Sequence, residues 1–288
     1  MNTNDRIKLG IQMFNFLPGG DWEQLSSQEE VEELLSQIAA AGYDGVEWCN
    51  FLFREDFPDL ISIKKKMDTL GLETVSLHFH LNPSEPTEET ARTAVKRCRL
   101  LGTDKLIFAY SLPTMFGIEP DGDGRYTPEQ IDDWAVQADQ VLSVLKNACE
   151  GTGINVLYHN HKPEFLTGTQ GRYFMDLIHP HGLEPDVYWV SKGLDGKVSS
   201  ALDYIRIRRK DVALLHVKDG LNGSVFTGEM CGWGKGTFPL QTIVDCAKEL
   251  DLDWIVIEND APKNFGTSGL EDARESAAYA AAQINFRK

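Results

Sequence analysis

Residues Ser27 to Trp48 read SQEEVEELLSQIAAAGYDGVEW, and they contain one complete helix followed by one strand. The apolar residues of Val31–Ala41 recur at three- and four-residue spacing, which predicts an amphipathic helix. Ser27 precedes this helix as a candidate N-cap, and Gly42 follows it as a C-terminal stop. The short apolar run Gly45–Trp48 then predicts a buried strand.

The same alternation of short β-rich runs and longer helical patterns continues along the chain. Eight runs are predicted as strands: Ile7–Met13, Gly45–Trp48, Thr74–Phe79, Lys105–Ala109, Ile154–Tyr158, Pro185–Val190, Val212–Val217 and Trp254–Ile257. Eight patterns are predicted as helices: Val31–Ala41, Leu60–Leu70, Glu88–Leu101, Pro128–Glu150, Tyr173–Ile178, Ser199–Ile205, Leu240–Leu250 and Leu270–Phe286.

Strands that are each followed by a helix favour an α/β fold of the (β/α)₈ TIM barrel type over an open doubly wound sheet. No Pro- or Gly-rich linker divides the chain, so residues 1–288 are expected to form a single domain. In such a barrel the loops after the strands lie at the C-terminal face, where the active site is built.

The composition argues against several classes of protein. The 288 residues include 28 Lys and Arg against 44 Asp and Glu, a formal net charge of −16 that opposes binding to nucleic acid or to anionic membranes. Apolar stretches of membrane-spanning length and a recognisable signal peptide are absent, so a cytoplasmic protein is expected. The five cysteines include no C-x-x-C pair, which argues against a disulfide framework and a thiolate zinc site.

Charged and imidazole side chains stand at the ends of several predicted strands. Because the parallel strands of a barrel point their C-terminal ends at one face, these side chains should share a pocket. Imidazole and carboxylate donors without a thiolate suit a divalent ion such as Mn²⁺, Mg²⁺, Co²⁺ or Zn²⁺. The residues concerned are Glu47, His78, His80, His159, His161, Asp186, His216, Lys218 and Glu258.

Several segments, in a fixed order along the chain, carry a family resemblance. They are GYDGVEW (Gly42–Trp48), SLHFH (Ser76–His80), YHNHKPEF (Tyr158–Phe165), DVYWV (Asp186–Val190), LHVKD (Leu215–Asp219), GWGKG (Gly232–Gly236) and IVIEND (Ile255–Asp260). Over nearly its whole length the chain resembles the sugar phosphate isomerase/epimerase proteins of the xylose-isomerase-like TIM barrel superfamily. The resemblance implies a small-molecule sugar as substrate.

The resemblance also implies a metal site. In that superfamily a divalent ion is held by an acidic residue after strand five, an Asp after strand six, a His after strand seven and a Glu after strand eight. Asp186, His216 and Glu258 match the last three positions, and His159 stands where the first acidic residue is expected. The implied ligands are therefore His159, Asp186, His216 and Glu258, with Mn²⁺ as the first expectation. In the ketose epimerases the first and last carboxylates are also the acid/base pair, so His159 calls a two-carboxylate mechanism into question.

Proton transfer next to a carbonyl is the chemistry that the resemblance implies. The metal would stabilise the enediolate that forms when the α-proton leaves. Glu258 is the first candidate for the base, and His161, Glu164 and Lys218 are alternatives. Candidate substrate-binding residues are Glu47, Trp48, His80, Glu164, Trp189, Lys192 and Trp233, whose tryptophans would offer flat apolar surfaces to a sugar.

The sequence leaves more than one function open. The first prediction is a metal-dependent isomerase or epimerase of a small sugar or keto-sugar. The YHNH segment Tyr158–His161 is also similar to the inosose dehydratase branch, so a dehydratase or keto-glycoside lyase is the main alternative. A non-catalytic sugar-binding barrel and an apurinic-site endonuclease are weaker alternatives, the latter because it would need a basic DNA groove. A homo-oligomer is expected only because soluble enzymes commonly self-associate.

Overall fold

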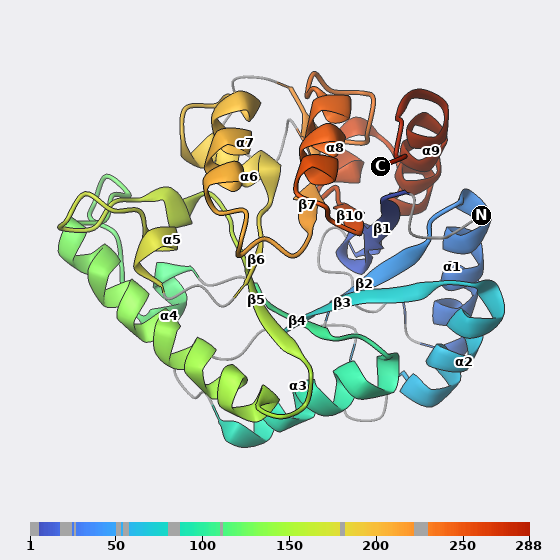
Figure 1. Cartoon of the computed structure of the whole chain (residues 1–288), viewed down its shortest axis with the longest axis horizontal. Coiled ribbons are helices and arrows are strands. Elements are labelled where there is room, and N and C mark those ends of the chain that lie inside the picture. Colours follow the sequence, from blue (N-terminus) through green and yellow to red (C-terminus); the bar gives the residue numbers. More distant parts are fainter. Residues whose placement is uncertain are drawn as a thin grey trace.

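A computed structural model describes residues 6–17, 25, 27–49, 53, 58–79, 87–109, 112–178, 182–221 and 230–288. Within these residues, eight parallel strands form one curved sheet that helices surround (Figure 1). The strands are β1 (Lys8–Gln12), β2 (Gly45–Cys49), β3 (Glu73–Phe79), β4 (Lys105–Phe108), β5 (Asn155–His159), β6 (Leu183–Glu184), β7 (Leu215–Val217) and β10 (Trp254–Ile257). The predicted α/β barrel is confirmed.

The sheet is a nearly closed barrel. Its strands pair in the order β6-β5-β4-β3-β2-β1-β10-β7. Single parallel bridges, from Leu183 to Val212 and from Asp186 to His216, join the two ends of this order. A short antiparallel pair, β8 (Asp219–Gly220) and β9 (Met230–Cys231), follows β7 outside the barrel sheet. The C-terminal ends of the eight strands therefore face the same side of the molecule.

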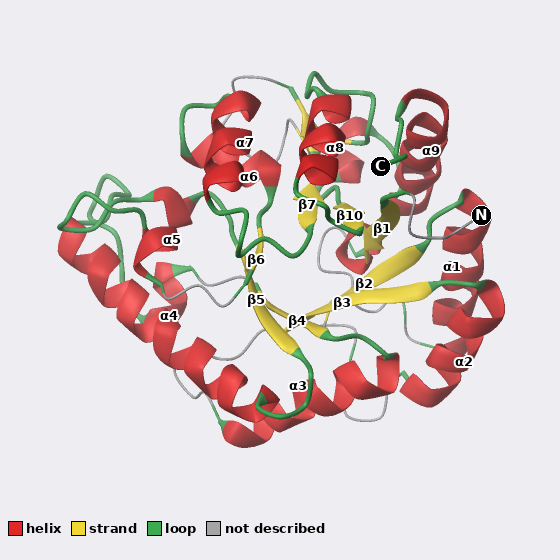
Figure 2. Ribbon diagram, in the orientation of Figure 1, coloured by secondary structure: helices red, strands yellow, loops and turns green. Residues whose placement is uncertain are grey.

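The helices pack around the outside of the barrel (Figure 2). They are α1 (Gln28–Ala41), α2 (Leu60–Leu70), α3 (Glu88–Leu101), α4 (Pro128–Cys149), α5 (Phe174–Leu177), α6 (Val187–Gly193), α7 (Val198–Ile207), α8 (Leu240–Glu249) and α9 (Gly269–Gln283). Short 3₁₀ turns are η1 (Met13–Phe16), η4 (Pro113–Phe116), η5 (Pro163–Phe165) and η6 (Pro262–Phe265). Within the described residues, none of these helices is both long and apolar enough to cross a membrane.

Local sequence signals explain where the helices begin and end. At the start of α1 the Ser27 hydroxyl accepts from the backbone N–H of Glu30, and the Glu30 side chain accepts from the Ser27 N–H. This reciprocal pair satisfies two N–H groups that the first turn leaves without partners. Gly42 ends the helix with a positive φ of 100°, which glycine adopts without strain. The predicted bounds of α2 and α3 agree with the structure at both ends.

A bulge in β3 decides which side chains of that strand face the barrel interior. Val46 pairs with Thr74 but Glu47 pairs with Ser76, so Val75 is an extra residue in β3. Val75 belongs to the apolar cluster that fills the barrel, with Ile107, Leu157, Leu214 and Val256 among its members. After the bulge the Ser76 hydroxyl bonds to the inward-facing Glu47. Because side chains alternate along a strand, His78 then also faces inward.

The prediction of a strand at Pro185–Val190 is wrong. The sixth strand is the shorter segment Leu183–Glu184, and the following residues form the helix α6. Pro185 has no N–H to donate to a strand partner. The Asp186 carboxylate accepts the N–H of Trp189 at 3.0 Å and so caps the helix start. The apolar run after Asp186 is buried as a helix.

Candidate active site

Buried polar side chains converge on the axis of the barrel at the C-terminal ends of its strands. We call Glu47, His78, His159 and Glu184 the deep group, and Asp186, Lys218, Glu258 and Asp260 the mouth group. The mouth residues Asp186 and Lys218 each lie two positions after a residue deeper in the barrel, Glu184 and His216. His216 contacts both groups. All of these side chains except Asp260 are buried. Burying so many ionisable groups is costly unless they are paired.

In the deep group, two carboxylates contact the imidazoles of His78 and His159 and also that of His216. Glu184 Oε2 lies 2.6 Å from His78 Nε2 and 3.0 Å from His159 Nδ1. Glu47 Oε1 lies 2.9 Å from His78 Nε2 and 3.0 Å from His216 Nε2. Two neutral donors, Gln12 at 2.6 Å and Ser76, complete the surroundings of Glu47.

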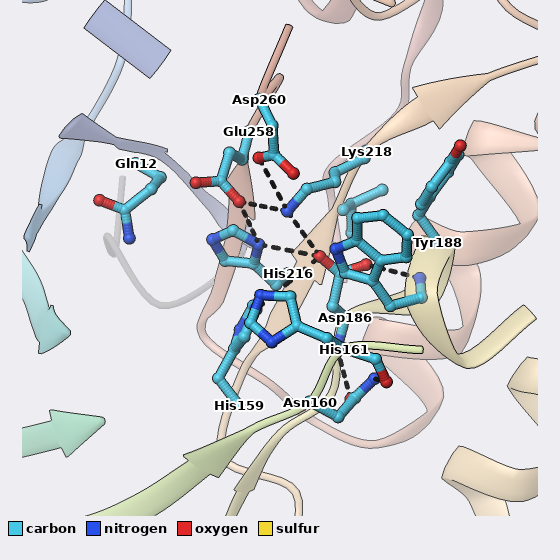
Figure 3. A network of polar contacts seen from close by, with 12 residues as sticks. Gln12, His159, Asn160, His161, Asp186, Tyr188, His216, Lys218, Glu258 and Asp260 are labelled. Atoms are coloured by element: carbon cyan, nitrogen blue, oxygen red, sulfur yellow. Dashed lines mark hydrogen bonds and ion pairs between the residues drawn. The ribbon is translucent and has the colours of Figure 1, made fainter. Parts of the chain in front are cut away.

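In the mouth group, one ammonium group lies among three carboxylates (Figure 3). Lys218 Nζ donates to Asp186 Oδ2 at 2.7 Å, contacts Glu258 Oε2 and lies 3.4 Å from Asp260 Oδ1. His216 Nδ1 lies 3.3 Å from Asp186 Oδ2 and 3.5 Å from Glu258 Oε2. The mouth group therefore already contains a cation of its own.

These contacts shift the protonation of the mouth group. Burial opposes the charge on Lys218, but Asp186, Asp260 and Glu258 raise the pKa of its ammonium group well above the usual value. Burial also raises the pKa of Asp186, yet Lys218 and His216 bring it down to about 2. Burial and then the charge of Glu258 raise the pKa of Asp260 to about 7. A charged lysine between charged Asp186 and Glu258 is the resulting state.

The two deep carboxylates differ in protonation. Burial raises the pKa of Glu47, but the charges and hydrogen bonds of His78 and His216 hold that pKa well below its usual range. Burial raises the pKa of Glu184 well above its usual range, and the neighbouring charge of Glu47 adds to this effect. Burial, followed by the charges of His216 and His78, lowers the pKa of the His159 imidazole. His159 is thus a neutral imidazole, the form in which histidine binds metals.

Backbone geometry fixes Asp186 at its place in the mouth group. The residue follows Pro185 and is the N-cap of α6, so one of its oxygens is held by the first turn of that helix. The Asn160 side chain accepts the Asp186 N–H at 3.0 Å. The other carboxylate oxygen of Asp186, Oδ2, contacts Lys218 Nζ and His216 Nδ1. The local sequence therefore orients the carboxylate toward the barrel axis.

Three further candidate residues lie near the rim. His161 has a side chain that is 21% exposed, and its Nδ1 lies 3.9 Å from Glu164 Oε1. Glu164 is fully buried and accepts a hydrogen bond from the Tyr158 hydroxyl at 3.2 Å. The rings of His161 and Trp189 lie 6.0 Å apart. This part of the site joins a partly exposed imidazole to a buried carboxylate.

The remaining predicted site residues lie in different surroundings. Trp48 and Trp233 are both buried in the outer hydrophobic core, where Trp48 packs against Phe53 and the Trp233 indole N–H donates to the Val217 carbonyl at 3.2 Å. Lys192 Nζ lies 3.5 Å from the Leu221 carbonyl oxygen. His80 lies outside the described residues.

Sequence reasoning overlooked Glu184 and Gln12. Glu184 directly precedes the segment predicted as strand six. Because that strand was placed too late in the sequence, Glu184 was not recognised as the last residue of a strand. The proline at 185 was the available signal, because a strand in a closed sheet does not usually continue through proline. Gln12 ends β1 in the same manner and carries no charge that would have drawn notice.

The donor atoms fit a divalent metal ion. The ligand atoms of His78, His159, Glu184 and His216 all lie within 4.8 Å of one another, and those of Asp186, His216 and Glu258 form a second such set. Sets of imidazole and carboxylate without thiolate suit Zn²⁺, Co²⁺, Mn²⁺ or Fe²⁺. The predicted ligands His159, Asp186, His216 and Glu258 are therefore divided between two overlapping sets that share His216.

An eight-stranded parallel α/β barrel with a buried polar cluster at its C-terminal face has the architecture of the TIM barrels. The chain belongs to the xylose isomerase-like TIM barrel family, whose sequence model matches residues 35–283. This confirms the resemblance drawn from the sequence.

Solved structures share the fold at low sequence identity. A sugar phosphate isomerase/epimerase from Parabacteroides distasonis ATCC 8503 is 23% identical with a TM-score of 0.67, covering 98% of this chain and 96% of the other. The IOLI protein with a binding zinc atom is 15% identical with a TM-score of 0.66, covering 96% of both chains. A probable 3-DHS dehydratase, AsbF from Bacillus anthracis, is 12% identical with a TM-score of 0.66, covering 96% and 100%. No curated protein sequence matches the chain.

Proposed function

We propose that this protein is a metal-dependent isomerase or epimerase of a small sugar or keto-sugar, which moves a proton next to a carbonyl group. The observation that carries the proposal is the buried convergence of imidazoles and carboxylates at the C-terminal face of the barrel. The isomerase/epimerase and zinc-containing structures that share the fold agree with it.

A divalent ion in this cluster would supply Lewis acidity that stabilises the enediolate. His159, Asp186, His216 and Glu258 remain the ligands predicted from the sequence. His159 and His216 belong to the deep donor set, whereas Asp186 and Glu258 are both bonded to Lys218. The reaction proposal does not depend on which carboxylates complete the shell.

Glu258 and Lys218 are suited to the proton transfer itself. Burial raises the pKa of Glu258, but Lys218 and His216 lower it below its usual value, so this side chain is a carboxylate that can accept the α-proton. Lys218 remains an ammonium group that can stabilise negative charge on the substrate oxygen. Because the two side chains contact each other, the proton can return to the neighbouring carbon or oxygen through the pair.

His161 is the proposed second proton carrier. Its imidazole is partly exposed, and Glu164 behind it is fully buried. The same arrangement supports the second candidate function, a dehydratase or lyase, because a hydroxyl that leaves after α-proton removal needs a proton donor. One of the solved structures that share the fold is a probable dehydratase, which agrees with this alternative.

Mass spectrometry after incubation in D₂O distinguishes the two reactions. The metal-reconstituted protein is mixed separately with aldoses, ketoses and keto-inositols. Exchange of one hydrogen for deuterium without further change of formula supports isomerisation or epimerisation, and loss of water supports dehydration. We expect E258Q to reduce the exchange rate by at least about a hundredfold, since a general base contributes 10²–10⁴-fold. The control E249Q changes a surface carboxylate of α8. Exchange in E258Q at the wild-type rate would exclude Glu258 as the base.

A further inference from the structure

We propose that the divalent cation of this protein binds in the deep group, to His78, His159 and Glu184 with His216 as the fourth ligand, and that Lys218 is the resident cation of the mouth group. The inference rests on the proposed function in one respect, since it assumes that the cation takes part in that reaction. It differs from the predicted ligand set by adding His78 and Glu184 and by excluding Asp186 and Glu258.

The geometry of the deep group already resembles a coordination shell. His159 and Glu184 are register partners on adjacent strands, which places their side chains next to each other. One oxygen, Glu184 Oε2, lies within 3.0 Å of ring nitrogens of both His78 and His159. The ring centroids of His78, His159 and His216 lie 4.7 to 5.6 Å apart. A metal with bonds of about 2.0–2.2 Å to nitrogen and oxygen fits after a small outward movement of these side chains.

The distribution of charge favours the deep group over the mouth group. Within the described residues, the ion-pair partners of Glu47 and Glu184 are imidazoles, and no lysine or arginine reaches either carboxylate. Asp186 and Glu258, by contrast, are both bonded to Lys218. A metal bound by those two carboxylates would displace a buried ammonium group, and placing two cations side by side is electrostatically unfavourable.

Glu184 gives an independent indication that the deep group is incomplete. Its side chain is fully buried, and its second oxygen, Oε1, accepts no hydrogen bond from a donor among the described residues. A buried carboxyl oxygen that accepts no hydrogen bond is rare in a protein interior. A cation bound to Glu184 would supply the partner that this oxygen lacks.

Glu47 borders the deep site. Its Oε1 lies within 3.0 Å of Nε2 of both His78 and His216, and it accepts hydrogen bonds from Gln12 and Ser76 through its two oxygens. Because His78 Nε2 also faces Glu184, Glu47 adds negative charge beside the nitrogen that would bind the cation. In this arrangement Lys218 and Glu258 directly follow the ends of β7 and β10 and are not ligands, so both remain available for proton transfer.

Metal titration of isosteric variants tests the inference. Chelator-treated wild type, E184Q, D186N and E258Q are titrated with Zn²⁺ by calorimetry, and Co²⁺ binding is followed by visible absorption. E184Q should weaken Zn²⁺ binding by at least about tenfold and abolish the four-coordinate Co²⁺ spectrum, because loss of even a supporting contact costs 10–100-fold. D186N removes a contact to His216 Nδ1 but no proposed ligand, so it should weaken binding less than E184Q and keep the four-coordinate Co²⁺ spectrum. Far-UV circular dichroism checks folding, and H78N is the second variant if E184Q does not fold.

The outcomes separate this inference from the proposed reaction. Weakened binding in D186N or E258Q with unchanged binding in E184Q would overturn it, as would a wild type that binds no divalent cation. Deuterium exchange into a sugar is measured on the same samples. If the wild type exchanges deuterium into a sugar and metal binding is lost in D186N but kept in E184Q, the proposed function holds and the deep site is excluded. A cation lost in E184Q, in a protein that exchanges no substrate, would support the deep site alone.

Discussion

Glu47, in the middle of β2, is held by four other side chains. Gln12 and Ser76 donate to it, and His78 and His216 lie within 3.0 Å of its Oε1. The sequence suggested a substrate-binding role, but these contacts occupy the carboxylate with protein groups. We infer that Glu47 is a positioning residue that orients two imidazoles.

Replacement of Glu47 by glutamine should therefore reduce stability. The amide cannot accept at both ends, so at least one buried donor loses its partner, and we expect the free energy of unfolding to fall by about 1–3 kcal/mol. Urea unfolding of E47Q is compared with that of E150Q, which changes an exposed glutamate after α4. If E47Q unfolds within about 0.5 kcal/mol of the wild type, the carboxylate does not hold the cluster together.

At the scale of elements, Asp219 organises the connection between β7 and α8. Its two oxygens accept from the backbone N–H groups of Gly220, Gly234, Gly236 and Phe238 at 2.7–3.2 Å. The glycines permit this close approach, because a Cβ on Gly236 would come within 2.1 Å of Asp219 Oδ1. The spaced glycines of this segment thus serve packing around a carboxylate.

The variant D219N tests this interpretation at the level of one segment. Its amide group presents a donor to backbone N–H groups, so the turn at residues 232–238 should lose order before the rest of the protein. We expect hydrogen exchange there to accelerate by roughly tenfold or more, corresponding to loss of about one to two hydrogen bonds. Exchange in α2 and α3 is the internal control. Unchanged protection at 232–238 would show that Asp219 is not needed to order the turn.

For the molecule as a whole, a polar network joins the first and last strand regions of the barrel. Asn15, in the turn after β1, accepts the backbone N–H of Asn259 at 2.7 Å and donates to the Gly269 carbonyl at 3.0 Å. Asn259 in turn donates to Asp272 on α9 at 3.1 Å. These contacts lie beside the pairing of β1 with β10, which joins the first and the last barrel strands in chain order.

Asp272 should make the stability of the whole molecule depend on pH. Burial raises its pKa above the usual value, and the hydrogen bond from Asn259 only partly opposes this. A carboxyl group with a raised pKa in the folded state favours folding most at low pH, and that contribution is lost as the pH rises through the folded-state pKa. The free energy of unfolding of the wild type minus that of D272N should therefore decrease from pH 4 to pH 7. Urea titrations at several pH values measure it, with the exposed α7 variant D203N as the charge control. An increase over this range would contradict the assignment.

Local physics explains what could be predicted from the sequence alone. Apolar periodicity and capping residues act within a few positions, so the bounds of α2 and α3, the capping of α1 and the order of strands and helices follow directly from the residues. The concentration of histidines and carboxylates at strand ends was equally visible, because the barrel fixes where strand ends point. His159, Asp186, His216 and Glu258 are accordingly in one polar cluster.

Contacts between distant residues were decided only by the tertiary structure. His78 and Glu184 are 106 positions apart, and their 2.6 Å contact depends on a bulge in β3 and on the early end of β6. Lys218 likewise meets Asp186 only because β7 lies beside the start of α6. Residue types and periodicity specify which side chains lie near the barrel axis, whereas strand register and stagger determine which of them touch. The sequence therefore determined the barrel and the composition of its polar cluster. The closure of the sheet determined which charged groups of that cluster contact one another.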